Sequence, residues 1–570
     1  MSYLTEDQFR QYMEVFSKAP ELTVDTEGTL THPHSETWGV SISYGGIAEY
    51  FAFNHMLGQN LPGEWLSAVV KVLENCPQLN FHHAKHDLKA LRNLGLNYTG
   101  KFYDTMLMQH MVNENLYSKE LDALAVHYKT ERKRNDSLMK DLIKGFGWDY
   151  VPVEIIRPYG ANDAYITEVI KNLIQPDFEA QGFDGELWDW EQRFCRLLMK
   201  IEDNGILINQ DLSQQQLEIG LKTMSAIEKR LGFNPGSPVQ LGNFLLEELK
   251  VPPVGEKGKS GRYSFNKENM KVYDELLALR NDETAKLILT YRGWQKTCSS
   301  NYKAYLELLR PDGRIRCNYK QHGTDTGRLS CEKPNLQQIP KVSDNPWNGH
   351  LKDAFIVEEG RTAYELDYSQ LEFRLGAAYG KEKKLLEIFN DDSRDIFSEM
   401  AADLHMTRNQ TKTLNYSIQY GAGVNRIKNV FGVTDNAAKA ILTNYYRQYQ
   451  GLAKVSTFAK NKCIERGYVQ YWTGRRRHFV NPSKQAHKAF NAAIQGGAFE
   501  IVKRAMVKVD EAGLNNDECK IDLQVHDSIR VDIVNGKEAE YLPEIKRVME
   551  DTPDFGVKFR VDVKRWGEKG

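Results

Sequence analysis

Two acidic residues near the N-terminus could together hold a divalent cation. Asp25 and Glu27 follow the apolar residues of a short predicted strand at 22–24, and their two-residue spacing puts both carboxylates on one side of that strand. Two like charges that lie close repel each other unless a cation sits between them. Acids at a strand end are more often turn residues, so this pair needs support from elsewhere in the chain.

Three further residues supply that support: Asp87, Tyr159 and Asp163. Tyr159 and Asp163 are four residues apart, which places them on one face of a helix. Four carboxylates and a tyrosine suit two-metal hydrolysis of a phosphodiester, because oxygen ligands hold hard cations and a tyrosine can orient the attacking water.

A second pair of acids lies in the C-terminal half. Asp367 falls at the end of a predicted strand that leads into a helix, where a ligand site is expected. Asp527 lies in the alternating segment 523–533 on the same parity as the apolar residues, and a carboxylate there is costly unless it is paired or metal-bound. A turn at His526 and Asp527 would make this segment a hairpin and remove that cost.

Between these acids, one helical stripe carries two cations and two aromatic side chains. Its members recur every four residues: Arg408, Lys412, Tyr416 and Tyr420. The charges suit the phosphates of a nucleoside triphosphate, and the rings suit its base and sugar. The same spacing also fits an ordinary amphipathic helix, with Leu414 and Ile418 facing protein.

The composition is that of a folded chain with several domains. The 570 residues allow about three to four domains, and 41% apolar with 27% charged residues is ordinary. No run of about 18 apolar residues occurs, which excludes a membrane span, and the acidic start lacks the apolar stretch of a signal peptide. Seven scattered cysteines with no CxxC pair argue against a zinc site or a disulfide framework and fit a reducing cytoplasm.

Local patterns predict the elements that must position these residues. Residues 1–180 are mixed α/β, with strands at 22–24 and at the alternating residues 40–44. Breakers and acids over 175–185 predict a seam, and a helix over 187–204 ends at a glycine.

The charge of the chain is nearly balanced, with 75 basic and 77 acidic residues and a net charge of −2. A nucleic-acid-binding protein usually carries a basic surface, which must here be local. The segment 461–490 provides one, with seven basic residues against one acid, a local charge of +6. A solvated face is the alternative interpretation of such a run.

The N-terminal acids resemble the motifs of the DEDDy proofreading 3′–5′ exonucleases. Asp25 and Glu27 match the first motif, Asp87 ends the second, and Tyr159 to Asp163 form the third. The resemblance covers about the first 180 residues and implies an RNase H-like fold with nuclease activity. One departure is His83, which stands where the second motif usually has Asn.

The three C-terminal segments resemble motifs A, B and C of the family A DNA polymerases, and the matches continue at 324–330, 334–340, 474–477 and 491–496. The resemblance implies an α/β multidomain protein in which an RNase H-like exonuclease domain precedes a right-hand polymerase domain. The implied bounds are 1–185 for the exonuclease and 186–570 for the polymerase, with a thumb at about 187–315, a palm at about 316–385 and 505–570, and fingers at about 386–504. The layout resembles a Klenow-like or phage-type enzyme without a 5′ nuclease domain.

The resemblance also implies two Mg²⁺ ions in each active site, which Mn²⁺ could replace. The implied metal ligands are Asp367, the Tyr368 carbonyl and Asp527 in the polymerase half, and Asp25, Glu27 and Asp163 in the exonuclease half. Asp87 and Tyr159 complete the catalytic set of the exonuclease. Lys412 is the implied general acid of the polymerase.

The other roles that the resemblance implies concern the nucleotide and the DNA. Residues of the nucleotide site are Arg408 and Lys412 on the phosphates, Glu372 against a 2′-OH, Tyr420 near the templating base, and Tyr416 and Gln370. Residues of the DNA site are Arg328, Asn491, Gln495 and His526 in the minor groove, with Arg475 and Arg476 on a phosphate track.

Three departures from the polymerase pattern bear on activity. Motif C has Ser528 where Glu is usual, and Phe397 stands where a phosphate-binding histidine often lies. Tyr416 stands where many relatives have Phe; in the family this weakens discrimination against dideoxynucleotides, because the hydroxyl replaces the missing 3′-OH. The sequence therefore predicts ready dideoxynucleotide incorporation.

The predicted function is template-directed DNA synthesis with 3′–5′ proofreading, in the replication of phage or bacterial DNA. The predicted partners are primer-template DNA, dNTPs and unidentified replication accessory proteins, and the protein is expected to be a monomer in the bacterial cytoplasm. Ser528 also occurs in single-subunit RNA polymerases, which are the main competing hypothesis; Glu372, Arg328 and the exonuclease argue against them. An exonuclease with an inactive polymerase half and a non-catalytic DNA-binding subunit are two further hypotheses.

Overall fold

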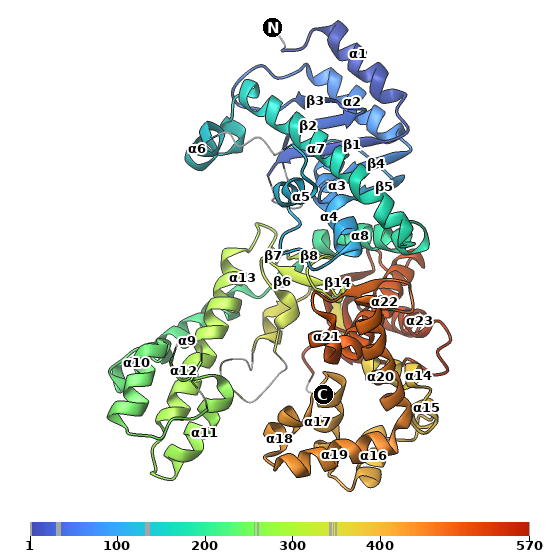
Figure 1. The fold of residues 1–570 in the computed structure, drawn as a ribbon. Helices are drawn as coiled ribbons and strands as arrows, with labels where there is room; N and C mark the ends of the chain where they lie inside the picture. The colour runs from blue at the N-terminus through green and yellow to red at the C-terminus, as the bar shows by residue number, and fades with distance from the viewer. Residues whose placement is uncertain are drawn as a thin grey trace.

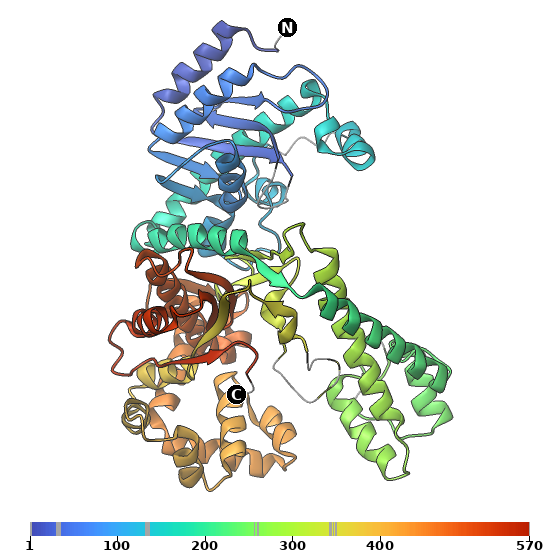
Figure 2. The ribbon, with the colours of Figure 1, turned by 180° about the vertical axis from the view of Figure 1, so that it is seen from behind.

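Two α/β bodies stacked on one another make up most of the molecule. The computed structural model describes residues 3–29, 36–131, 137–255, 257–258, 261–340, 345, 347 and 350–568. A long helical arm and a group of shorter helices project from the lower body (Figure 1). The view from behind shows the same division (Figure 2).

A five-stranded mixed sheet forms the centre of the N-terminal body, with the strand order β3-β2-β1-β4-β5. The strands are β1 (Leu22–Gly28), β2 (Thr37–Tyr44), β3 (Ile47–Ala52), β4 (Gln78–Phe81) and β5 (Lys101–Asp104). β1 pairs antiparallel with β2 and parallel with β4, so it lies in the middle of the sheet. The strands predicted at 22–24 and 40–44 are confirmed as β1 and β2.

Helices cover both faces of this sheet. They are α1 (Glu6–Ser17), α2 (Gly63–Asn75), α3 (Ala84–Asn93), α4 (Thr105–Val112), α5 (Leu121–Tyr128), α6 (Ser137–Phe146) and α7 (Val153–Ala180). Leu22 and Val24 share a buried core with residues of α1 and α2. Because side chains alternate along a strand, Asp25 and Glu27 point to the opposite face, where α7 packs.

Gly160 allows α7 to lie close to the sheet. A Cβ at this position would lie 2.7 Å from Cδ2 of Tyr50 and 2.8 Å from Oγ of Ser41, which is closer than packed atoms approach. α7 continues through Pro176, so the seam predicted from 175 begins too early in the sequence. Around Pro176 the helix buries Ile174 and Phe178 in a core shared with α4 and α5, and this packing keeps the helix intact despite the N–H that a proline lacks.

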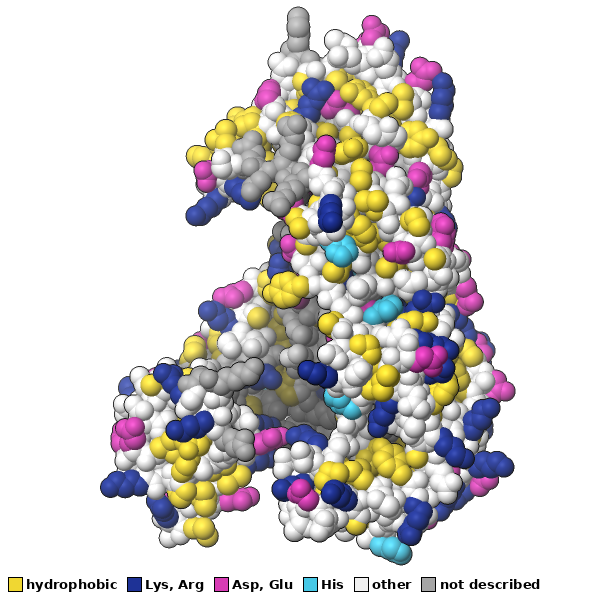
Figure 3. All heavy atoms as spheres, in the orientation of Figure 1, with side chains coloured by type: hydrophobic (Ala, Val, Ile, Leu, Met, Phe, Trp, Pro, Cys, Tyr) yellow, Lys and Arg dark blue, Asp and Glu magenta, His cyan; other side chains and the backbone are white. Residues whose placement is uncertain are grey.

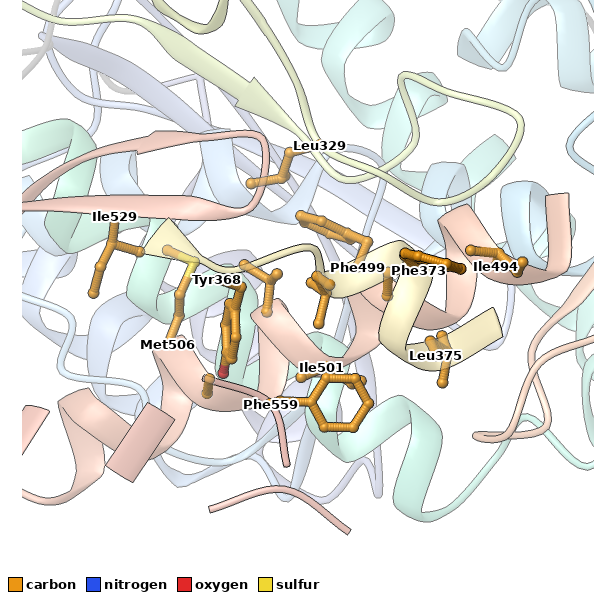
Figure 4. Packing of buried hydrophobic residues seen from close by; sticks show 14 of the residues in the cluster. Leu329, Tyr368, Phe373, Leu375, Ile494, Phe499, Ile501, Met506, Ile529 and Phe559 are labelled. Carbon is orange, nitrogen blue, oxygen red and sulfur yellow. The ribbon is translucent and has the colours of Figure 1, made fainter. Parts of the chain in front are cut away.

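A four-stranded antiparallel sheet, in the order β14-β15-β11-β16, forms the centre of the lower body. The strands are β11 (Arg361–Tyr368), β14 (Cys519–Val525), β15 (Ser528–Val534) and β16 (Val561–Arg565). The predicted hairpin turn at 526–527 is confirmed between β14 and β15. Helices α14 (Leu371–Gly380) and α22 (Ala489–Glu511) contribute Phe373 and Phe499 to the core that also contains Tyr368 and Ile529 (Figure 4).

The arm consists of α9 (Gln210–Leu231), α10 (Pro238–Asn243), α11 (Lys267–Ala278), α12 (Thr284–Thr297) and α13 (Lys303–Glu307). The helix predicted at 187–204 is confirmed as α8 (Glu186–Asn204), with Gly205 at its C-cap. α8 packs against α22 and β14 and lies between the two α/β bodies in both views (Figures 1 and 2). α8 is therefore not part of the projecting arm, although the predicted thumb at about 187–315 includes it.

The shorter helices opposite the arm are α15 (Lys383–Asn390), α16 (Ile396–Leu404), α17 (Arg408–Gln419), α18 (Val424–Phe431), α19 (Asp435–Gln448) and α20 (Gln450–Arg466). The remaining elements near the sites are the strand pairs β8 (Asn318–Lys320) with β9 (Ser330–Glu332) and β12 (Tyr468–Gln470) with β13 (Arg476–His478), and α23 (Glu538–Glu550). In the space-filling view a hollow separates the arm from these helices, and Lys and Arg side chains lie on both sides of it (Figure 3).

Two exclusions made from the sequence can be compared with the structure. Within the described part of the chain, no helix is long and apolar enough to cross a bilayer. All seven cysteines are buried free thiols, as their spacing predicted.

Candidate active sites

The first candidate site joins β1 to α7. Asp25, Glu27 and Asp163 each offer a carboxylate oxygen that lies within 4.8 Å of the other two. Asp25 is half-buried and the other two are buried. Three carboxylates this close repel one another, and an all-oxygen donor set of this kind fits a hard divalent cation.

Asp87 lies on α3 and supports the strand that carries this cluster. Its Oδ1 accepts hydrogen bonds from the backbone N–H of Thr26 at 3.2 Å and from the Thr26 hydroxyl at 2.7 Å. Among the described residues, its Oδ2 has no hydrogen-bond partner. Asp87 is therefore bound to the residue between Asp25 and Glu27, and it stands outside the group of three carboxylates.

Tyr159 and His83 differ in their relation to the carboxylate cluster. Tyr159 is buried one turn before Asp163 on α7, with the Trp148 ring 6.4 Å away between centroids. His83 begins α3 in a left-handed conformation, with φ of 81°. Its ring lies 6.0 Å from that of His86 and 6.4 Å from that of His322 in the lower body. Burial lowers the pKa of His83 well below its usual range, so it is a neutral residue at the junction of the two bodies.

The second candidate site is a cleft of about 820 Å³ over the four-stranded sheet. Its lining includes these predicted site residues: Arg328, Asp367, Tyr368, Gln370, Glu372, Tyr416, Tyr420, His526 and Asp527. β11 and β15 pair with Asp367 opposite Ser528, and the Tyr368 N–H donates to the Asp527 carbonyl at 3.2 Å. The pairing brings the two acids that the resemblance implied as metal ligands to the same end of the two central strands.

The turn between β14 and β15 shapes the environment of Asp527. His526 adopts a left-handed conformation with φ of 53°, which closes the turn in two residues. Asp527 thereby leaves the apolar alternation, and its side chain stays one-quarter exposed. Burial raises its pKa, while Arg328 and His526 act in the opposite direction. Two acids at this edge have the donor chemistry for a divalent cation, although Ser528 replaces a third.

Arg328 connects the acids of the cleft. Its Nη2 donates to Oε1 of Glu372 and lies 3.6 Å from Oδ1 of Asp527. Burial raises the pKa of Glu372 even though Arg328 lowers it. Arg328, which is predicted to contact the minor groove, thus lies at one wall of the cleft between the carboxylates of Glu372 and Asp527.

The predicted stripe of motif B lies along α17, which begins with a capping box between Thr407 and Gln410. Arg408, Lys412 and Tyr420 are exposed and Tyr416 is half-buried, while Leu414 and Ile418 are buried as predicted. Arg408 and Lys412 do not line the cleft described above.

Two neighbours of α17 belong to the segment in which the sequence departs from the polymerase pattern, and of these only Asp395 was given no role. Asp395 caps α16 and binds Arg408 through two hydrogen bonds of 3.0 Å. Arg408 and Ser398 lower the pKa of the Asp395 carboxyl. Phe397 is buried, 6.2 Å from the ring of Phe373 and 6.1 Å from that of Tyr416. The position where a histidine often binds phosphate is thus part of an apolar wall.

One predicted member of the phosphate track in the basic segment 461–490 lies inside the protein. Arg475 is buried and donates to Glu191 at 2.6 Å and to His110 at 3.1 Å. Its predicted contact with DNA does not fit this environment, because the guanidinium is enclosed by protein partners. Arg476 is half-buried and donates to Gln181 at 3.2 Å.

The two amide residues predicted to contact DNA lie one turn apart on α22, where both are half-buried. Asn491 donates to the carbonyl of Gln419 at the end of α17, at 3.0 Å. Gln495 follows four residues later on the same face. Lys352 and Lys564 also line the cleft, and no motif in the sequence marks them.

Comparison with known proteins places both halves of the chain. The family model of DNA polymerase family A matches residues 207–568, and that of the 3′-5′ exonuclease domain matches residues 2–179. The predicted order of an exonuclease domain followed by a polymerase domain is therefore confirmed.

Curated relatives are bacterial proteins named DNA polymerase I. The chain is 30% identical to that of Pseudomonas aeruginosa over 93% of its own length and 61% of the relative. For Chloroflexus aurantiacus the values are 29%, 90% and 57%, and for Borreliella burgdorferi 27%, 100% and 64%. The chain thus spans about three fifths of the length of these relatives.

A solved structure shares the fold. It is described as the POL domain of Pol1 from M. smegmatis in complex with DNA primer-template and dNTP. The TM-score is 0.85 at 23% identity, over 100% of this chain and 99% of the other.

Proposed function

Because this chain belongs to DNA polymerase family A, we propose that it extends a DNA primer along a template and that its N-terminal domain removes mispaired 3′ ends. The observation that carries the proposal is the cleft over the four-stranded sheet. It gathers Asp367, Asp527, Glu372 and Arg328 from three separate segments of the sequence. The related polymerase solved with primer-template and dNTP supports DNA and dNTPs as its ligands.

In the polymerase site, Asp367 and Asp527 would hold Mg²⁺ together with the Tyr368 carbonyl. Bound there, the ions would supply the positive charge that phosphoryl transfer requires. Arg408 and Lys412 contact the triphosphate from the exposed face of α17, and Lys412 donates a proton to the leaving pyrophosphate. Glu372, which pairs with Arg328 in the cleft, excludes a 2′-OH, so the site selects deoxynucleotides.

In the exonuclease site, Asp25, Glu27 and Asp163 would hold the cations that polarise the scissile phosphate. Tyr159 orients the attacking water from the turn of α7 that precedes Asp163. Asp87 keeps β1 in place through its two hydrogen bonds to Thr26. The two sites use separate carboxylates, so each can be inactivated without the other.

Primer extension with Mg²⁺ tests the proposal, with dNTPs and rNTPs compared and with Asp367→Ala and Asp25→Ala variants beside the wild type. We expect extension with dNTPs only, its loss in Asp367→Ala, and loss of primer degradation but not of extension in Asp25→Ala. Glu544→Ala, at a half-exposed acid on α23 that lines neither site, is the matched control.

Two outcomes would contradict the proposal. Extension with rNTPs at a comparable rate would favour a single-subunit RNA polymerase-like enzyme. Primer degradation without extension in the wild type would mean that the polymerase half is inactive. Ser528→Glu and Phe397→His, which introduce the residues usual in the family, would then be the first variants to test for recovery of extension.

A further inference from the structure

The loop over 324–329, between β8 and β9, carries Arg328 to the polymerase cleft. Its own hydrogen bonds close a turn: the Gly327 N–H donates to the Thr324 carbonyl at 3.2 Å, and the Thr324 hydroxyl donates to the Arg328 carbonyl at 2.8 Å. Leu329 is buried and enters the core beneath the loop (Figure 4). The turn is compact, but these contacts do not determine where the whole loop lies relative to Glu372 and Asp527.

Side chains from outside the loop contact each residue of 324–327, which form the outer edge of the loop. An imidazole nitrogen of His110, Nε2, lies 2.9 Å from the Thr324 carbonyl. Arg477 donates to Asp325 at 2.9 Å, and the Tyr471 hydroxyl donates to the Thr326 carbonyl at 3.2 Å. A Cβ on Gly327 would lie 2.8 Å from Nε of Arg475, so that guanidinium packs directly on the turn.

One of the residues that contact this edge, His110, comes from the exonuclease domain. His110 lies on α4, and Arg475 donates to its Nδ1 at 3.1 Å. An arginine can only donate, so Nδ1 carries no proton and Nε2 carries the proton that is donated to Thr324. Burial and the charge of Arg475 lower the pKa of His110 well below its usual range, which keeps this neutral form.

Glu114, which follows α4, holds the other arginine of the edge. Its Oε1 accepts from Nη1 of Arg477 at 2.6 Å, and Oε2 lies 3.0 Å from Nδ1 of His478. Glu114 thereby fixes the β12–β13 hairpin, which in turn holds Asp325 through Arg477.

A buried acid from α8 completes the arrangement. Glu191 is fully buried and accepts from Arg475 at 2.6 Å and from Lys503. Buried charges are stable only when they are paired. Moving one partner away would leave the remaining charges buried without a partner, which costs a large desolvation free energy. The contacts around the loop therefore have one arrangement and are not easily adjusted one at a time.

We propose that His110 and Glu114 of the exonuclease domain are positioning residues of the polymerase site, which set the place of Arg328 by fixing the loop over 324–328. The inference rests on the proposed polymerase function. It means that the proofreading domain contributes to nucleotide insertion through protein contacts, apart from its own hydrolysis. Coupling between docking of the exonuclease domain and DNA binding at Arg328 is reciprocal, so bound primer-template also stabilises the docked exonuclease domain.

The test uses the full chain carrying Asp25→Ala, so that the primer is not degraded. Single-turnover insertion of one dNTP is compared for His110→Ala, His110→Gln and the exposed-residue control His127→Ala. We expect the maximal insertion rate to fall at least tenfold in His110→Ala with primer-template affinity changed less than threefold. His110→Gln should restore most of the rate, because an amide can accept from Arg475 and donate to Thr324.

A double-mutant cycle separates positioning from general stability. If His110 acts through Arg328, His110→Ala should cause no further loss in an Arg328→Ala background. With Asp25 intact, hydrolysis of single-stranded DNA by His110→Ala should stay within twofold of the wild type. Glu114→Gln provides a second variant if His110→Ala unfolds below the assay temperature, and it should lower the insertion rate in the same way.

Normal insertion by both His110→Ala and Glu114→Gln would overturn the inference, and so would an additive loss in the Arg328→Ala background. Absence of extension in the Asp25→Ala parent would instead overturn the proposed function itself. The two failures are therefore distinguishable.

Discussion

Arg408 and Asp395 form a bidentate ion pair, with Nε–Oδ1 and Nη2–Oδ2 distances of 3.0 Å, at the entrance of α17. Both side chains are about half exposed, so solvent screens the pair and it contributes at most about 1 kcal/mol. The guanidinium that is expected to bind the triphosphate is therefore already occupied by a carboxylate. The incoming nucleotide must displace Asp395 or share Arg408 with it.

Asp395→Asn should therefore strengthen nucleotide binding. Asparagine retains the N-cap of α16, where the side chain accepts from the Ser398 N–H at 2.7 Å, but it removes the competing charge. We expect the KM for dNTP to fall by about two- to fivefold with kcat within twofold, corresponding to less than about 1 kcal/mol. Steady-state insertion kinetics measure this, with Asp391→Asn in the same loop as the control. A higher KM would show that Asp395 orients Arg408 instead of competing for it.

Tyr416→Phe should restore discrimination against dideoxynucleotides. Tyr416 lines the cleft with its ring against the buried Phe397, so only its hydroxyl is available to replace a missing 3′-OH. Loss of one such hydrogen bond is worth about 1.4 kcal/mol, or a tenfold change. The ratio of ddNTP to dNTP incorporation should fall by about that factor, whereas Tyr420→Phe should leave it within twofold. Equal termination by Tyr416→Phe would refute the role of the hydroxyl.

Gly160→Ala should impair proofreading more than polymerisation. The added Cβ would press on Tyr50 and Ser41, so α7 must move away from the sheet and carry Asp163 with it. Overpacking of this kind costs about 1–3 kcal/mol, and we expect exonuclease activity to fall by roughly tenfold. Gly145→Ala on α6, where a Cβ would meet no atom within 4 Å, is the control. Unchanged hydrolysis with a lower unfolding temperature would mean that α7 relaxes without moving Asp163.

Local pattern was sufficient to predict the elements that carry the carboxylates. The spacing of Asp25 and Glu27 indicated a shared strand face. The parity of Asp527 left two interpretations open, a metal-bound carboxylate on a strand or a hairpin turn, and the structure has the turn. Burial of Arg475 could not be predicted in this way. Its partners Glu191 and His110 are 284 and 365 residues away, so a run of arginines looks the same whether it meets phosphate or buried acids.

The pair of Arg408 with Asp395 shows a second limit. The turn between α16 and α17 that brings the two side chains together has no strong signal of its own in the sequence. The path of α7 through Pro176 is a third case, since packing against α4 and α5 overrides the local preference of proline.

His55 should make folding sensitive to acid. Burial lowers its pKa to about 4, from a usual 6.5, and its Nε2 lies 2.7 Å from the Tyr50 hydroxyl. In the unfolded chain His55 is protonated below about pH 6.5, whereas in the folded chain it is protonated only below about pH 4. The free energy of unfolding therefore falls by up to about 3 kcal/mol as the pH is lowered through that interval. The difference between wild type and His55→Gln in urea unfolding at several pH values should show this slope. His127→Gln, at an exposed histidine on α5, is the matched control. A pH-independent difference for His55→Gln would contradict the neutral buried state.

The carboxylate cluster of the exonuclease site should destabilise the protein until a cation binds. Asp25, Glu27 and Asp163 lie within 4.8 Å of one another, so Asp163→Asn relieves repulsion, and in EDTA we expect it to raise the free energy of unfolding by about 1 kcal/mol. Mg²⁺ at tenfold above its dissociation constant should stabilise the parent by about 1.4 kcal/mol and the variant by much less. The difference between their free energies of unfolding should therefore narrow or change sign. Differential scanning calorimetry measures both effects. All variants carry Asp367→Ala, so that Mg²⁺ binding at the polymerase cleft contributes little. Asp122→Asn, at an exposed acid on α5, is the matched control. Equal responses of parent and Asp163→Asn to Mg²⁺ would mean that Asp163 is not a ligand of the cation, and would contradict this prediction.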